Sequence, residues 1–430
     1  MIKRLILILL MFASTGPLTP LQGAEKLSLR TCIDIALKNQ PAIVAAREGV
    51  NAGQGRVTQA TSPYLPQVSA STGYSESRSL GGALGDSISK SYATSLSINQ
   101  VIYDFGKTGS TLDAARLGTR SLERDLERVV QETILNVKQS YFALLAARKL
   151  LVVAQKTVEQ AESHLKQAEA FFRSGSKPRF DVTRAEVEVN NAALGLINGK
   201  NSVRLSTISL CNVMGIDPSS DMDIDDILLA PTSIPPMEKA LTDSMKNRPD
   251  MLKAEADIDA ARATVKANQS NYLPTLSANG AYSWAHGTSE MGPYKGDLQN
   301  SWNAGVSLSM PLYEGGLTGG KVSEAKANVR AVEAQRNTLR QSIIVELNQA
   351  YADIESATAR MAVMELSLKK AQESLDLAQG RYEDGVGPYM EITDAQVASV
   401  SAETNHVQAL YDYQLATARL YKAMGRGLEN

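Results

Sequence analysis

Chemically reactive side chains are few in this 430-residue sequence, and their spacing does not build a recognisable reaction centre. The segment Phe105-Gly106-Lys107-Thr108 ends like a phosphate-binding loop, but Val101 stands where such a loop needs its first glycine. The three histidines, His164, His286 and His406, are scattered and lack the spacing of metal ligands. No pair of a nucleophile and a base can be identified. We therefore expect a protein that is not an enzyme and that uses no metal and no cofactor.

An acidic, proline-rich segment interrupts the chain near its middle. Between Ile216 and Pro236 the sequence holds five aspartates and four prolines. A calcium-binding loop would need a central glycine and a distal glutamate, which this segment lacks. We interpret residues 216–237 as a linker that packs outside the main body.

Cys32 and Cys211 are the only cysteines. An oxidising compartment would allow them to form a disulfide. Two small, buried and unpaired side chains would be equally consistent with the sequence. The pairing stays open at this point.

The N-terminus has the features of a secretion signal. Two basic residues precede an apolar run from Leu5 to Ala13, and small residues lead to Ala24. This run of about nine residues is too short for a membrane anchor. The sequence predicts a signal peptide over residues 1–24 and an exported protein. The exact cleavage site stays open because Gln22 fits poorly at its position.

The charge of the chain excludes one class of partner. The full sequence has 44 basic and 46 acidic residues and a net charge of −2, which becomes −4 once Lys3 and Arg4 are removed. This balance gives no indication of nucleic-acid binding. No other segment approaches a membrane-spanning helix, so any insertion into a membrane must use β-structure.

The mature chain consists of two similar halves. Tyr64-Leu65-Pro66 recurs as Tyr272-Leu273-Pro274 at an offset of 208, and Met214-Gly215 recurs as Met424-Gly425 at an offset of 210. Such an agreement over most of the chain indicates a duplication. The first repeat, the linker and the second repeat are assigned to residues 25–215, 216–237 and 238–430.

Each repeat is expected to contain two strands. In the first repeat a helical pattern over Leu29–Ser62 ends before Pro63, which a helix does not easily pass. Apolar and polar residues alternate over Val68–Tyr74, a Gly/Ser-rich loop follows around Gly81–Gly85, and alternation returns at Leu96–Gln100.

The second repeat shows the alternation more cleanly, over Trp302–Met310. Segments of this length with aromatic residues near their ends are typical of membrane β-barrel strands. A half-buried hairpin of a soluble protein would show the same pattern, so the strands alone do not distinguish the two.

Long helices complete each repeat. The segment Lys107–Phe172 contains no proline, and at roughly 1.5 Å per residue it predicts a rod of about 100 Å. Apolar residues follow heptad spacing in both repeats, from Val130 to Leu144 and from Met361 to Tyr382. Shorter helices return after glycine turns and begin with a proline in their first turn; they are expected over Pro178–Met214 and Pro388–Met424.

Four strands per chain cannot close a barrel, and open sheet edges are not tolerated in lipid. Two copies would give eight strands and a barrel filled by its own side chains. Three copies would give twelve strands and leave room for a lumen. A water-filled bore without chemistry would be a conduit.

Several segments resemble the TolC-family outer-membrane efflux proteins. The similarity is clear in "RPDMLKAEADIDAARATVKANQSNYLPTLSANGAY" from Arg248 and at the strand-to-helix junctions "VIYDFGKTG" from Val101 and "PLYEGGLTGG" from Pro311. It extends to the hairpin turns "FRSGSKPRFDV" from Phe172 and "RYEDGVGPYMEITDAQ" from Arg381. Together these segments cover nearly the whole mature chain in both repeats.

The resemblance implies a mostly α fold with a small β part. A homotrimer would combine the long coiled-coil helices into an α-barrel in the periplasm. Its four strands per chain would form a 12-stranded transmembrane β-barrel in contact with outer-membrane lipid. The partners implied by the resemblance are a periplasmic adaptor protein and an inner-membrane pump.

The resemblance also implies a gate at the periplasmic entrance. Tyr382 matches the family's gate tyrosine, and Asp181 matches the aspartate to which that tyrosine bonds. Glu391 and Asp394 match an acidic ring at the constriction, where like charges would repel one another and attract cations. The gate arginine of the family is absent, because Gly387 stands at its position. How tightly this gate is locked is therefore left open.

The turns Ser174-Gly175-Ser176 and Asp384-Gly385-Val386 match the tips that dock the adaptor in the family. Glycine in such a turn is also explained by the positive φ that a helix end requires. The sequence does not identify the pump, nor whether the cargo is a drug, a metal or a protein. The alternative function is a periplasmic coiled-coil scaffold without a pore.

Overall fold

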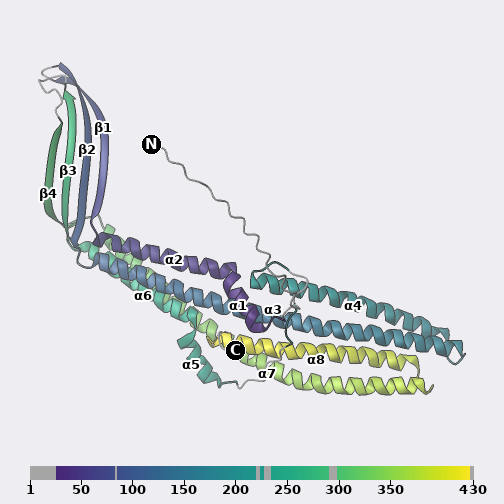
Figure 1. Ribbon diagram of the computed structural model, residues 1–430. Coiled ribbons are helices and arrows are strands. Elements are labelled where there is room, and N and C mark those ends of the chain that lie inside the picture. The colour runs from purple at the N-terminus through teal and green to yellow at the C-terminus, as the bar shows by residue number, and fades with distance from the viewer. Residues whose placement is uncertain (1–25, 83–84, 219–222, 227–233, 290–297, 427–430) are drawn as a thin grey trace, which may run out of the picture.

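The computed structural model describes residues 26–82, 85–218, 223–226, 234–289 and 298–426. Figure 1 shows a rod of long helices with a four-stranded sheet at one end and two helical hairpins at the other. The fold is mostly α with a small β part, as the sequence predicts. The expected signal peptide, residues 1–24, lies outside the described residues.

Each repeat opens with two helices that are separated at a proline. α1 (Leu29–Asn39) and α2 (Pro41–Thr61) meet at Gln40, which has φ −64° and ψ 119°. A residue before proline avoids the helical region, so the prediction of one continuous helix over Leu29–Ser62 is wrong at this point. The second repeat has the same break between α5 (Met237–Asn247) and α6 (Pro249–Gln269). Short 3₁₀ turns follow α2 and α6; these are η1 (Ser62–Tyr64) and η2 (Ser270–Tyr272).

The four strands form one antiparallel sheet in the order β1-β2-β3-β4. Their bounds are β1 (Gln67–Gly82), β2 (Gly85–Tyr103), β3 (Thr275–Ser289) and β4 (Gln299–Ser309). The central pair, β2 and β3, joins the two repeats, with Asn99 opposite Asn279.

The Gly/Ser-rich segment belongs largely to the strands. The expected loop is wrong at Gly81, Gly82 and Gly85, because β1 extends to Gly82 and β2 starts at Gly85; residues 83 and 84 lie outside the described residues. Serine hydroxyls pair across these strands, with Ser69 Oγ 2.7 Å from Ser97 Oγ. Such cross-strand pairs stabilise a ladder that is poor in large side chains.

Two helices of 67 residues form the length of the rod, α3 (Lys107–Arg173) and α7 (Leu317–Glu383). At 1.5 Å per residue each is about 100 Å long. α3 starts after Gly106, which has φ 89°, and the carboxylate of Asp104 accepts the backbone N–H of Thr108 at 2.8 Å. The sequence that ends like a phosphate loop is therefore a junction between a strand and a helix.

Shorter helices return along the long ones. They are α4 (Arg179–Met214) and α8 (Tyr389–Ala423). Pro178 and Pro388 occupy the N-cap positions, one residue before the first turn in which the sequence places them. Their ψ values of 157° and 150° are extended and turn the chain into the helix.

The helices form a wall with the same order as the sheet. Toward the tips α3 contacts α4 on one side and α8 on the other, and α8 contacts α7. The order α4-α3-α8-α7 thus places the first repeat beside the second, as in β1-β2-β3-β4. Heptad residues of α3 are buried in this wall, among them Val137, Tyr141 and Leu144.

α1, α5 and the described part of the linker lie against the middle of the rod (Figure 1). Leu27 pairs with Ile224, and the Tyr141 hydroxyl donates to the carbonyl of Asp225 at 2.7 Å. Arg148 on α3 forms an ion pair of 2.6 Å with Asp223. The linker is thus held on one face of α3.

Both cysteines are buried here and are free thiols. Burial, together with the nearby Cys211, raises the pKa of Cys32 to about 11. Cys32 is therefore protonated and unreactive at neutral pH. Within the described residues no helix combines the length and the apolar character needed to cross a membrane.

Candidate functional site: the hairpin tips

The predicted site residues gather at the end of the rod where the two helical hairpins turn. Gly175 and Gly385 take the left-handed conformation, with φ 75° and 76°. The N–H of Ser176 bonds to the carbonyl of Phe171, and the N–H of Val386 bonds to that of Arg381, each at 3.0 Å. These bonds close the ends of α3 and α7. The six tip residues from the sequence are all exposed; they are Ser174, Gly175, Ser176, Asp384, Gly385 and Val386.

Tyr382 lies at the centre of an apolar cluster that joins all four helices. We call this the tip cluster; it comprises Ala168, Ala185, Leu375, Ala378, Tyr382, Tyr389, Ile392 and Ala395. The Tyr382 ring is fully buried, with Phe171 and Tyr389 at centroid distances of 5.4 and 5.5 Å in edge-to-face contacts. Such aromatic pairs add to the stability gained from burial.

The Tyr382 hydroxyl is buried and makes no hydrogen bond of ordinary geometry among the described residues. Burial and the neighbouring carboxylate of Asp181 raise its pKa to about 12. Asp181 itself is 8% exposed in the first turn of α4. The structure thus brings the predicted pair together: Asp181 acts on Tyr382 through its charge and as a side-chain hydrogen-bond partner, although the contact does not reach the geometry of an ordinary hydrogen bond.

The two acids assigned to the constriction differ in their surroundings. Glu391 accepts from Arg381 Nε at 2.9 Å, so its charge is compensated within the same chain. Asp394, one turn further along α8, is exposed. The pairing of Glu391 could not be read from the heptad pattern, because it joins the end of α7 to the start of α8 across the turn.

Glu188 on α4 is a site residue that the sequence did not reveal. Its carboxylate accepts the hydroxyl of Tyr389 at 2.8 Å and that of Thr393 at 2.5 Å, both on α8. Arg184 lies 3.9 Å away on the same helix. Burial and this hydrogen bond raise the pKa of Tyr389. Glu188 therefore ties the first hairpin to the second through side chains 201 and 205 residues apart.

Lys177 is a second contact that the sequence did not reveal. Its ammonium donates to the carbonyl of Gly387 at 3.1 Å and lies 5.1 Å from the centroid of the Tyr382 ring. Lys177 and Gly387 are equivalent positions of the two repeats, 210 residues apart, but equivalence alone does not predict a contact. Predicting it would have required knowledge that the two turns touch.

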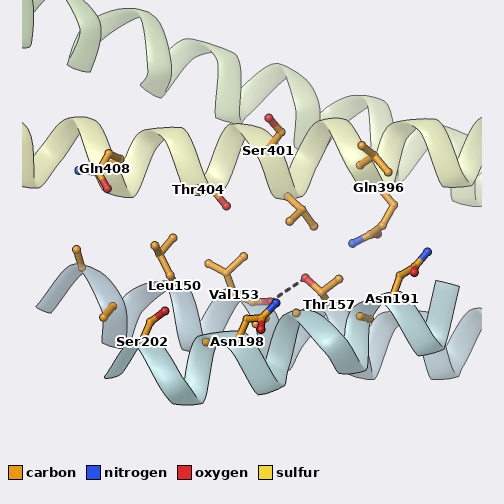
Figure 2. A pocket seen from close by; sticks show the side chains of 18 of the residues that line it. Leu150, Val153, Thr157, Asn191, Asn198, Ser202, Gln396, Ser401, Thr404 and Gln408 are labelled. Atoms are coloured by element: carbon orange, nitrogen blue, oxygen red, sulfur yellow. Dashed lines mark hydrogen bonds between the residues drawn. The ribbon is translucent and has the colours of Figure 1, made fainter. Parts of the chain in front are cut away.

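A groove runs along the wall behind the tips. Figure 2 shows it between α8 and the pair α3 and α4, and its volume is about 910 Å³. Leu150 and Val153 contribute to an apolar floor, whereas Asn198 and Gln396 supply amides at the sides. Lysine and arginine are absent from its lining among the described residues.

The groove and the linker occupy opposite faces of the wall. Leu150 follows Arg148 by two residues on α3, so their side chains point in directions about 200° apart around the helix axis. Arg148 contacts the linker, and Leu150 faces the groove. A tube built from such walls would therefore have the linker on one surface and the groove on the other.

The acidic side chains at these sites make hydrogen bonds and ion pairs and do not cluster as metal ligands would. Among the described residues, no group of three or more His, Cys, Asp and Glu side chains could hold a metal ion. The carboxylates of the tips contact hydroxyls, a guanidinium or solvent.

Comparisons with known proteins agree with this architecture. A family model described as "outer membrane efflux protein" matches residues 32–216 and 240–426. Protein CyaE of Bordetella pertussis is 27% identical over 403 residues, which are 93% of this chain and 84% of that protein. Outer membrane protein TolC of Vibrio cholerae is 23% identical over 422 residues, 98% of this chain and 95% of that protein.

A solved structure shows the same fold. The Campylobacter jejuni CmeC outer membrane channel superposes with a TM-score of 0.82 at 19% identity and covers 93% of this chain and 86% of that chain. The family model matches twice, once in each repeat, and together the matches span most of the sequence. The chain belongs to the outer membrane efflux protein family.

Proposed function

We propose that three copies of this chain form an exit duct for efflux of small molecules or for type I secretion. The sheets would close into a 12-stranded barrel in the outer membrane, and the helical walls would form a tube through the periplasm. The observation that carries the proposal is the pair of open flanks on each copy, which have the same order in the sheet and in the helical wall.

The sheet supplies the first pair of flanks. Within the described chain, β1 and β4 each pair with a strand on one side only. Joining β1 of one copy to β4 of the next would satisfy both edges, as lipid requires. This is a head-to-tail contact, which closes into a ring when the rotation fits.

The helices supply the second pair of flanks. Apolar side chains that are more than half exposed form a stripe on α4; they are Val187, Leu194, Ile197 and Leu205. A second stripe lies on α7 and comprises Val345, Val363, Leu366 and Leu377. α4 and α7 are the outermost helices of the wall, so the stripe of one copy can cover that of the next.

The two stripes match in height. Leu194 lies 19 residues after Gly175, and Leu366 lies 19 residues before Gly385. At 1.5 Å per residue both are about 28 Å from their tips. The distances from the tips therefore agree with contact between the helices of neighbouring copies.

The tips provide the remaining features of the duct. We propose that the exposed turns contact a periplasmic adaptor, which links the duct to an inner-membrane pump. Val386, 70% exposed, would be one contact. Closure of the mouth would involve Asp181 and Tyr382 inside each copy, with Glu391 and Asp394 facing the opening.

Crosslinking tests the ring. Leu194→Cys and Leu366→Cys are introduced together into a chain in which the native Cys32 and Cys211 are replaced by alanine. Oxidation should produce covalent dimers and trimers, and the largest product should be the trimer. The matched control places the second cysteine at Leu368, which is partly buried in the heptad seam and lies outside the exposed stripe.

Two results would contradict the proposal. Equal crosslinking of the control and the test variant would show that α4 and α7 of neighbouring copies do not meet at this point. Crosslinked products that stop at the dimer would exclude a ring of three copies. Purified protein should also conduct ions in planar bilayers. Trimers that crosslink as expected but never conduct would be a periplasmic scaffold without a pore.

A further inference from the structure

The two hairpin turns of one copy are held together by few polar contacts. The tip cluster packs the four helices beneath the turns, and Glu188 joins α4 to α8 near its edge. Beyond these contacts, the turns themselves meet through Lys177. A movement of the second hairpin away from the first would have to break this contact.

Lys177 makes two contacts at once. Its ammonium donates to the carbonyl of Gly387 in the second turn, at 3.1 Å, and lies 5.1 Å from the centroid of the Tyr382 ring. A charge-assisted hydrogen bond is stronger than a neutral one, and an ammonium over an aromatic face adds an attraction of its own. Both partners belong to the second hairpin, whereas Lys177 belongs to the first.

Gly387 explains why the cation comes from the first turn. A Cβ atom at this position would lie 3.1 Å from Arg381 Cβ and 3.3 Å from a carboxylate oxygen of Glu391. The missing side chain leaves room for the ion pair between Arg381 and Glu391. A long basic side chain at 387 would therefore disturb this pair, whereas a lysine at the equivalent position of the first turn does not.

We propose that Lys177 is the latch of this gate. It holds the second hairpin against the first within each copy, and both of its contacts break when the second hairpin swings away. The latch is a positioning residue: it acts on the mouth through Tyr382 and the backbone of Gly387. This inference rests on the proposed function, because a latch needs a mouth to close.

The latch is built to open without unfolding the tips. Lys177 is only partly buried, so water can replace the carbonyl of Gly387 when the contact breaks. Within each hairpin the two helices also pack along each other, α3 with α4 and α7 with α8, independently of Lys177. Loss of the latch should therefore loosen the turns and leave the helices folded.

Two variants and one control test the latch. Lys177→Met keeps the length of the side chain and removes its charge and its donors. Lys177→Arg keeps a cation that can reach the same carbonyl. Arg173→Met is the matched control, because it removes one positive charge next to the same turn. The contacts of Arg173 are with Glu169 of its own helix, an ion pair of 3.9 Å and a hydrogen bond of 3.3 Å to the carbonyl.

Amide hydrogen exchange of the purified protein in detergent measures whether Lys177 stabilises the second turn, and this measurement does not depend on transport. Lys177→Met should accelerate exchange of the amides of residues 385–387 about thirtyfold, the lower end of the sum expected for one charge-assisted hydrogen bond and one cation–aromatic contact, because the site is partly exposed. Lys177→Arg should restore most of the protection, and Arg173→Met should have none of this effect. Unchanged exchange in Lys177→Met, or equal acceleration in Arg173→Met, overturns the latch.

Conductance in planar bilayers then tests the gating role. Lys177→Met should conduct more than the wild type, and Arg173→Met should match the wild type. Faster exchange without higher conductance would mean that Lys177 joins the turns but does not control the opening, which overturns the gating claim. If the wild type itself forms no channels, it is the proposed duct that fails, and the exchange result still decides whether the contact exists.

Discussion

Replacement of Arg248 by methionine is expected to loosen the junction between α5 and α6 far more than the matching change in the first repeat. Arg248 is 6% exposed, and its guanidinium contacts Asp250 through two hydrogen bonds, of 2.7 and 3.1 Å. It also bonds to Glu346 at 2.7 Å and to the carbonyl of Ala423 at 3.2 Å. Arg248 thus connects the start of the second repeat to α7 and to the end of α8.

The first repeat supplies a matched control. Gln40 lies at the equivalent position, and its amide donates to the carbonyl of Val213 at 3.0 Å. At this position the first repeat therefore has one neutral hydrogen bond, whereas the second repeat has a buried network of ion pairs. Gln40→Met removes a single such bond, which is worth about 1 kcal/mol.

The loss of stability expected for Arg248→Met depends on the carboxylates that lose their partner. Breaking a buried ion pair costs about 3–5 kcal/mol because one charge is left uncompensated. Asp250 has a side chain that is 19% exposed, whereas Glu346 is 37% exposed and keeps Lys422 at 3.2 Å. We therefore expect the lower end, about 3 kcal/mol, and a second change of Asp250→Ala should recover part of it.

Hydrogen exchange at the end of α8 measures this cost. The amides of Gly425 and Arg426 bond to carbonyls of the last turn, at 2.9 Å each. A loss of about 3 kcal/mol predicts exchange about 100-fold faster in Arg248→Met, and about 1 kcal/mol predicts about fivefold at the equivalent amides in Gln40→Met. Equal acceleration in the two variants would refute the reasoning.

The same network predicts a dependence on pH. Burial alone would raise the pKa of Asp250, but the hydrogen bonds and charge of Arg248 outweigh it, so the pKa is lowered. The ionised carboxylate therefore stabilises the junction at neutral pH, and this contribution is lost as the pH falls below about 4, the ordinary value of an aspartate. At acidic pH the difference in exchange rate between wild type and Arg248→Met should therefore become smaller.

Three further predictions concern the tips and the buried thiols. A double-mutant cycle of Glu188→Gln and Tyr389→Phe, read by exchange at the start of α8, should give a coupling of about 1.5 kcal/mol, as expected for a hydrogen bond to a charged acceptor; additive effects would contradict it. In planar bilayers Asp394→Ala should reduce cation selectivity more than Glu391→Ala, because Glu391 already has a guanidinium partner; unchanged selectivity in the double variant would remove the acidic ring. Native protein should resist alkylation of Cys32 at pH 8, since the thiol is buried and has a pKa of about 11; rapid labelling without denaturant would contradict the packing of α1.

Much of the fold was readable from the sequence because its signals are local and repeated. The heptad spacing of α3 and α7 predicted long rods, and the glycines at 175 and 385 predicted the turns. The prediction failed at Gln40, where a proline limits the residue before it, and around Gly81–Gly85, where small residues extend a ladder instead of ending it. The first miss was local, because Pro41 restricts the residue directly before it, whereas the second depended on the partner strand that the glycines pair with.

The candidate site was predictable only in part. Asp181 and Tyr382 were identified by resemblance, and the structure places them together, because each follows from its distance to a tip glycine. Lys177 and Glu188 were missed, because their partners lie more than 200 residues away in the other repeat. No spacing rule along the chain predicts which side chains meet across two hairpins.

The sequence by itself determined the duplication, the rods, the strands and the turns, since each is set by periodicity or by the backbone preferences of single residues. Only the tertiary structure decided how the first hairpin touches the second, which of the acids keeps a free charge, and which apolar stripes remain uncovered on α4 and α7. These properties depend on packing between segments that are distant in the chain. The physical reason is that a side chain is buried, or its charge compensated, by a second surface, and the two surfaces meet only after the chain has folded.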